Sequence, residues 1–165
     1  YSSWAKTEVA AAGEHGLTES FSYPRLDITR ENFTMLAMNL YNKIYPNKEI
    51  PALETKFTDC RDDPNVNNAA VLGIVTGYED GTFRPDTYIT RAQAMTMINR
   101  VLNRIPEDES DLLPGMNVWP DCNPGDWFYL AVQEATNSHD FEHKAGNYET
   151  WTKLMKNPDW TRYEN

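Results

Sequence analysis

The feature that most constrains the fold of this chain is an internal repeat. The pair Thr29-Arg30 recurs 61 residues later as Thr90-Arg91, and Thr152-Lys153 follows after another 62 residues. The pair Asp59-Cys60 returns 62 residues later as Asp121-Cys122. Because independent landmarks share one period, we expect three copies of one supersecondary unit that share a core.

Apolar residues within each unit recur with the spacing of a helix that buries one face. The pattern predicts helix, loop and helix in the first two units, and a first helix followed by an irregular segment in the third. We therefore expect a mainly all-α fold of three repeats in a pseudo-threefold cluster, with a degenerate third repeat. The predicted repeats are residues 1–46, 57–105 and 116–165; the predicted helices are 4–15, 29–44, 64–73, 90–105 and 126–139.

The spacing also bears on where the chain starts. Trp4 and Trp127 lie 123 residues apart, the sum of the two threonine steps. The first copy of the Phe-x-Asp-Cys element would then precede Tyr1, so the chain is expected to begin inside its first repeat and to be cut from something longer.

Composition excludes several classes of function. Aromatic residues make up 12% of the chain, too many for a disordered tail. The formal net charge of −10 argues against a nucleic-acid binder, which needs a basic surface. No segment has the length and apolarity of a membrane span, and no signal peptide is visible. No cofactor is expected.

The Thr-Arg pairs open the predicted second helices. Threonine is a good N-cap, and Gln93 completes a capping box with Thr90. Arg30 and Arg91 then fall in the first helical turn, where a cation opposes the helix dipole. Free N–H groups and a guanidinium at one point form a site for a carboxylate or phosphate. The alternative is an ion pair between each arginine and a neighbouring unit.

The loop in the second repeat, residues 77–86, combines Gly77 with a turn signal at Asp80 and Gly81. Its aromatic residues, Tyr78 and Phe83, could stack on sugar rings. The alternative is a tight loop held by buried aromatic side chains.

These residues resemble the S-layer homology family, the modules that anchor bacterial surface proteins to the cell wall. The second repeat is most similar, over residues 72–101, and the resemblance extends to residues 2–17, 28–41 and 126–144. It implies a non-catalytic, extracellular module of three helical repeats. Its grooves would bind secondary cell-wall polysaccharide, an anionic sugar polymer that typically carries pyruvylated N-acetylmannosamine. The ketal of that sugar supplies a carboxylate.

The resemblance implies a set of ligand-binding residues: Thr29, Arg30, Thr90, Arg91, Gly77, Tyr78, Asp80, Gly81, Lys153, Trp4 and Trp127. The chain also departs from the family pattern. The first repeat lacks the glycine-rich loop, and the third repeat has Lys153 in place of arginine with no helix after it. A lysine supplies a point charge without the two-pronged fork. A structural module that contacts other envelope or S-layer proteins, with degenerate grooves, is therefore the alternative function.

Two further features of the sequence bear on function. His139, Asp140 and His143 lie within about one helical turn and could hold zinc, but we favour a capped helix end there, no metal and no enzyme. Cys60 and Cys122 occupy equivalent repeat positions as small buried residues, and whether they are bonded stays open. The tryptophans of the last unit are expected to be mainly core: Trp119, Trp127, Trp151 and Trp160.

Overall fold

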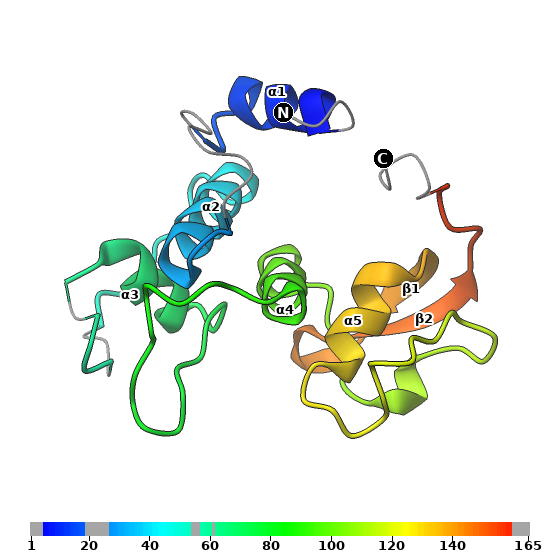
Figure 1. Cartoon of the computed structure of the whole chain (residues 1–165). Coiled ribbons are helices and arrows are strands. Elements are labelled where there is room, and N and C mark those ends of the chain that lie inside the picture. Colours follow the sequence, from blue (N-terminus) through cyan, green and yellow to red (C-terminus); the bar gives the residue numbers. More distant parts are fainter. Residues whose placement is uncertain (1–4, 19–26, 54–56, 61, 160–165) are drawn as a thin grey trace. The chain divides into compact units, whose positions relative to one another are not determined.

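The computed structural model describes residues 5–18, 27–53, 57–60 and 62–159 (Figure 1). The chain divides into two compact units, the first Tyr1–Ile89 with Asp159–Asn165 and the second Thr90–Pro158, so the boundary after Ile89 falls within the second predicted repeat. The first unit holds the helices α1 (Lys6–Glu14), α2 (Arg30–Ile44) and α3 (Pro64–Val71). The second holds α4 (Arg91–Leu102), α5 (Tyr129–Thr136), the strands β1 (His139–His143) and β2 (Glu149–Leu154), and the short 3₁₀ helices η2 (Glu109–Asp111) and η3 (Ala145–Asn147).

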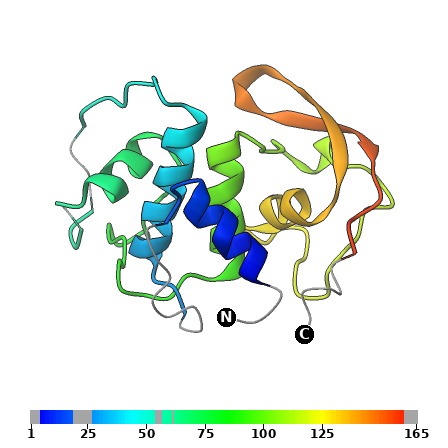
Figure 2. The same ribbon diagram turned by 90° about the horizontal axis from the view of Figure 1, so that it is seen from above.

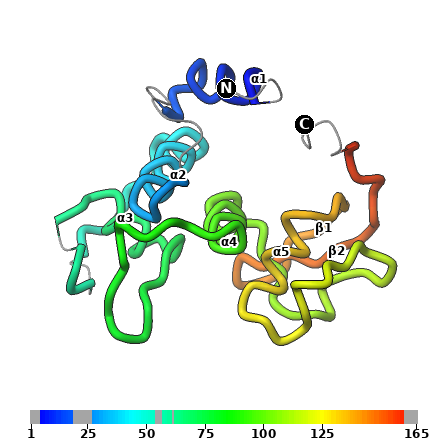
Figure 3. The backbone as a smooth tube through the Cα atoms, viewed as in Figure 1, coloured from blue at the N-terminus to red at the C-terminus, as the bar shows by residue number. Residues whose placement is uncertain are grey.

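In the first unit, α2 packs against α3 (Figure 3). The helix α2 begins as expected, with the Thr29 hydroxyl accepting the Asn32 N–H at 3.3 Å. The helix α3 starts at Pro64, and the Asp63 side chain accepts the Val66 N–H at 2.9 Å. The helices predicted over 4–15, 29–44 and 64–73 are confirmed within a few residues of their ends.

The core of the first unit lies where α2, α3 and the loop after α3 meet. Met38 and Val66 are buried, and so are Ile74 and Phe83 from that loop. The ring of Phe57 packs on Phe83 with 5.4 Å between centroids. The loop therefore belongs to the core, and this fixes its backbone for the site described below.

The second unit is built around α4 and α5, which contact each other. Thr90 and Gln93 form the predicted capping box. The helix α4 ends at Leu102, three residues before its predicted end, because Asn103 adopts a left-handed conformation with φ of 56°. The Asn99 side chain donates to the Ala131 carbonyl on α5 at 2.9 Å, which ties the two helices together.

A two-stranded antiparallel sheet follows α5 and corrects the expected fold class. Strands β1 and β2 form a hairpin, orange in Figure 2, where an irregular segment was predicted. Gly146 and Asn147 supply positive φ values of 82° and 65° between the strands. Trp151 is buried on the inner face of β2, and this burial favours the strand. The fold is therefore mixed α and β, and the division into three repeats remains a prediction.

Among the described residues, none of the helices combines the length and apolarity that a membrane crossing requires.

Candidate functional site

The loop over residues 77–84 is a rigid element of the first unit. A Cβ atom on Gly77 would meet the Phe57 ring and lie 2.8 Å from the Thr82 carbonyl oxygen, so only glycine fits. Gly81 has a φ of 78°, which favours glycine. The Asp59 carboxylate accepts the backbone N–H groups of Phe83 and Arg84, both at 2.8 Å. The repeated Asp-Cys landmark thus includes the residue that anchors this loop.

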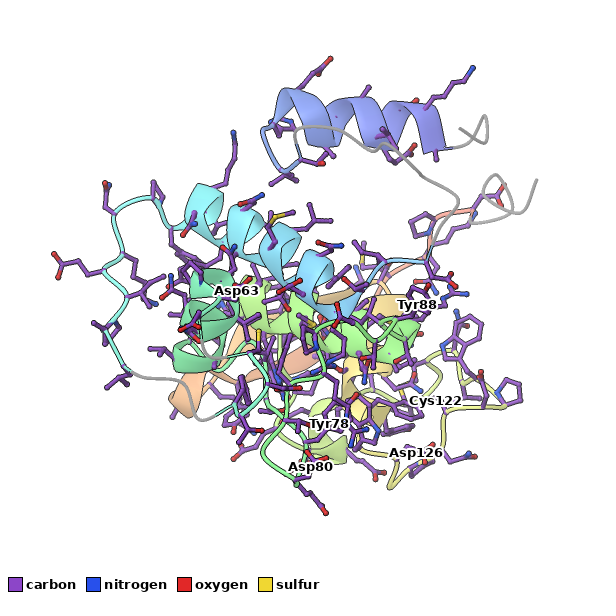
Figure 4. The ribbon with its side chains drawn as sticks, turned by 60° about the vertical axis from the view of Figure 1, so that its left-hand side comes forward. Asp63, Tyr78, Asp80, Tyr88, Cys122 and Asp126 are labelled. Atoms are coloured by element: carbon purple, nitrogen blue, oxygen red, sulfur yellow. The ribbon has the colours of Figure 1, made fainter. Side chains whose placement is uncertain are left out.

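The Asp80 carboxylate organises the same loop from within (Figure 4). It accepts the Thr82 N–H at 3.0 Å and the Thr82 hydroxyl at 2.6 Å, and it pairs with Arg84 at 2.9 Å. The Thr82 hydroxyl and Arg84 hold the pKa of Asp80 down at about 2. Asp80 is therefore ionised, and its carboxylate oxygens accept hydrogen bonds from the loop itself.

Arg30, at the start of α2, is enclosed by this loop. Its side-chain Nε donates to the Phe83 carbonyl at 3.0 Å, and its guanidinium lies 5.1 Å from the ring centre of Tyr78 and 4.8 Å from that of Phe83. The residue is only 6% exposed. Burial lowers the pKa of Arg30, the Tyr78 hydroxyl opposes that effect, and Arg84 adds to it. Arg30 thus joins α2 to the loop through a carbonyl and two rings, and none of the described residues gives it a carboxylate partner.

The aromatic residues of the loop differ in exposure. Phe83 is fully buried, so it cannot stack on a sugar. Tyr78 is half-buried and has the Arg84 guanidinium 3.9 Å from its ring centre. Phe83 therefore holds the loop from within, as the alternative interpretation expects. One face of the Tyr78 ring is covered by the Arg84 guanidinium.

In the second unit, Arg91 has the same place in the Thr-Arg motif and a different environment. It is the first residue of α4 and is exposed. Its side chain makes no hydrogen bond or ion pair within the described ranges of the chain. The cation stands beside the N-terminal N–H groups of a capped helix, where an anion would be stabilised.

The remaining predicted site residues are scattered. Lys153 is exposed on β2, so it does not open a helix. Trp127 precedes α5 and is 67% exposed, with its ring edge-on to Phe128 at 5.3 Å. Trp4 lies outside the described residues. Of the other tryptophans, Trp151 is core, and Trp119 is 39% exposed with its indole N–H donated to the hydroxyl of Thr136. Trp160 also lies outside the described residues.

A buried charged cluster in the second unit was not predicted. Glu134, His139 and Glu149 offer ligand atoms that lie within 4.8 Å of one another. The Arg104 guanidinium stands among them, with Nη2 2.9 Å from Glu134 Oε1 and 2.7 Å from His139 Nε2. A resident cation therefore fills the position that a metal ion would need. The predicted helix end at His139 and His143 is wrong, because both lie on β1.

His139 is the centre of this cluster. Its side chain is 2% exposed and its ring stacks on Trp151 with 4.0 Å between centroids. Burial opposes the charged imidazole, but the hydrogen bonds to Glu134 and Glu149 outweigh burial and raise the pKa of His139. The cluster joins the end of α4, α5 and both strands.

Both cysteines are free thiols and buried. Burial, with the charges of nearby carboxylates, raises the pKa of Cys60 to about 11. Burial also raises the pKa of Cys122. Neither thiol is a ready nucleophile.

Comparison with known proteins agrees with the motif. The family model of the S-layer homology domain matches residues 57–95, which include the loop and the Thr90-Arg91 helix start. Residues 57–95 are therefore similar to S-layer homology domains. The resemblance inferred from sequence is thereby confirmed, and it indicates a location at the cell surface or in the cell wall. No solved structure is significantly similar to the chain.

Several curated proteins are similar to the chain. Cell surface glycoprotein 1 of Acetivibrio thermocellus is 27% identical over 84% of the chain, and the cellulosome-anchoring protein of the same organism is 24% identical over 93%. An amylopullulanase of Thermoanaerobacterium thermosulfurigenes is 33% identical over 61%. The chain spans 6% of the first protein, 35% of the second and 6% of the third.

Proposed function

We propose that the chain is a non-catalytic anchor that binds secondary cell-wall polysaccharide and holds an exported protein at the bacterial surface. The single observation that carries this proposal is Arg91, an exposed guanidinium at a capped helix start with no protein partner in the described ranges. A carboxylate on the polymer matches its charge and the N–H groups beside it.

The proposed ligand is an acidic sugar such as pyruvylated N-acetylmannosamine. Thr90 keeps the helix start in place, and Arg91 receives the carboxylate. In the first unit, Gly77, Tyr78, Asp80 and Gly81 form a second proposed binding surface, and Thr29 and Arg30 support it from the start of α2. Lys153 and Trp127 are proposed to contact the polymer through a charge and a ring face, and Trp4 is retained as a sequence prediction.

Calorimetric titration with purified wall polysaccharide, before and after chemical removal of pyruvate, tests the proposal. The wild-type chain should bind the native polymer and lose binding after pyruvate is removed. Arg91→Ala should weaken binding by about 2 kcal/mol, roughly 30-fold, through loss of a charge-assisted bond. The control Lys156→Gln removes an exposed charge of the same unit and should leave affinity unchanged. Equal binding with and without pyruvate would refute the carboxylate part.

A second candidate function is a protein-interaction module in an envelope assembly. It is favoured by two strongly exposed apolar side chains, Val118 at 69% and Trp127 at 67%. It predicts that the wild-type chain fails to bind the polysaccharide but binds purified S-layer protein in sedimentation experiments.

A further inference from the structure

Arg84, in the loop of the first unit, is a residue that the motif did not single out. Its φ is 60°, a left-handed conformation that a long side chain rarely adopts. The Asp59 carboxylate holds it there by accepting its backbone N–H, and the Thr87 side chain donates to its carbonyl at 2.8 Å. Such strain persists only where the surroundings impose it, and it concentrates at binding sites.

The strained backbone places the Arg84 side chain over Tyr78. The guanidinium lies 3.9 Å from the ring centre, which fixes its plane. Nη2 pairs with Asp80 and Nε donates to the Thr82 hydroxyl at 3.3 Å, so two of the three nitrogens are oriented by the loop itself. The third nitrogen, Nη1, makes no hydrogen bond within the part of the chain that the structure describes. The side chain is 46% exposed.

Arg84 and Arg30 have different roles in the predicted anion site. Both guanidinium groups lie near the Tyr78 ring, and the pKa of Arg30 is lowered by burial first and further by the positive charge of Arg84. Arg30 is enclosed and bonded to the Phe83 carbonyl, so it cannot present its fork to solvent. The geometry points to Arg84 as the residue of this loop that receives the carboxylate of an acidic sugar, with Arg30 as a positioning residue near the Tyr78 ring.

Asp80 would limit the affinity of this site without preventing binding. Its carboxylate uses the Nη2 edge of Arg84, and this ion pair is exposed, so it holds the guanidinium weakly. A sugar carboxylate can approach the Nη1 edge and share the charge. The inference rests on the proposed function, because the acidic wall polysaccharide is the ligand that supplies the carboxylate.

The test compares Arg84→Gln, Arg84→Lys and Arg84→Gly with the control Lys43→Gln, an exposed charge at the end of α2. Affinity for wall polysaccharide, with and without pyruvate, is measured by calorimetry in the wild-type and Arg91→Ala backgrounds, so that losses at the two cations are separated. Arg84→Gln should weaken pyruvate-dependent binding about tenfold to a hundredfold. Arg84→Lys should lose less, and Lys43→Gln should have no effect.

Arg84→Gly distinguishes a binding role from a structural one. Glycine relieves the backbone strain, so the variant should lose binding while its thermal midpoint stays unchanged or rises. Lost binding with lowered midpoints in both Arg84→Gly and Arg84→Gln would overturn the inference in favour of a structural role. Binding by Arg84→Gln within twofold of a pyruvate-dependent wild type would overturn the inference alone. Failure of the wild-type chain to bind would overturn the proposed function and the inference with it.

Discussion

The two Thr-Arg helix starts allow a matched test, because the same motif has two environments. Replacement of Arg30 by methionine keeps an unbranched apolar stem and removes the guanidinium that lies against Phe83 and Tyr78. The equivalent change at Arg91 removes a guanidinium that has no protein partner in the described ranges. We predict that the first change destabilises the fold and the second does not.

The magnitude follows from the contacts of Arg30. A buried hydrogen bond from a charged donor contributes about 1.5–3 kcal/mol, and the cation–π contacts add about 0.5–1 kcal/mol each. Removal of a cation from the first helical turn returns about 0.3–1 kcal/mol, because that cation opposes the dipole. Arg30→Met should therefore lower the free energy of unfolding by about 2–4 kcal/mol, and Arg91→Met, which loses no described contact, should leave it unchanged or raise it by up to about 1 kcal/mol.

Urea unfolding followed by far-UV circular dichroism measures the effect. With a typical slope for a small protein, the Arg30→Met midpoint should fall by about 1–2 M. Hydrogen exchange gives a local readout, since the N–H groups of Arg30 and Glu31 donate to the carbonyls of Thr87 and Pro85. These two amides should exchange faster in Arg30→Met and normally in Arg91→Met. Equal shifts of the urea midpoint in the two variants would refute the assignment of different roles.

Two further predictions concern the second unit and the thiols. Because the pKa of His139 is raised in the folded state, its contribution to stability is complete below the ordinary value of 6.5 and is lost as pH rises through the raised value. Thermal melts of the wild type should therefore show this loss above pH 6.5 and His139→Gln should not, whereas the exposed control His143→Gln should behave as wild type. Because Cys60 and Cys122 are buried free thiols, a thiol reagent at pH 7.5 without reductant should react slowly with the native chain and rapidly with both after denaturation. If the denatured chain had no reactive thiol, the two cysteines would not be free thiols and the prediction would be wrong.

The helix starts could be predicted from sequence because their causes are local. A threonine cap, a first-turn residue and an apolar stripe lie within one segment, and α2 and α4 begin where these signals place them. The end of α4 was less predictable, since Asn103 ends the helix through a left-handed conformation that its apolar neighbours do not reveal. The hairpin was missed for a similar reason, because the burial of Trp151 that favours β2 depends on α5 and the cluster beneath it.

The burial of Arg30 could not be predicted, because it depends on contacts with residues more than 50 positions away. The Phe83 carbonyl, 53 residues along the chain, turns a first-turn arginine from a candidate ligand contact into part of the core. Arg84 escaped notice for the converse reason. Its motif position is unremarkable, and only the positive φ and the stacking on Tyr78 reveal it.

The contrast between the two arginines explains how one repeated motif can serve both folding and binding. A cation in the first turn of a helix is unfavourable by itself, so it needs an electron-rich partner. In the first unit that partner is internal, and it consists of a carbonyl and two rings of the loop. In the second unit the described residues supply none to Arg91, and the proposed function assigns that role to an external anion. The loop of residues 77–84 therefore makes Arg30 part of the scaffold, whereas Arg91, which no described residue pairs with, is the helix-start arginine proposed to meet the ligand.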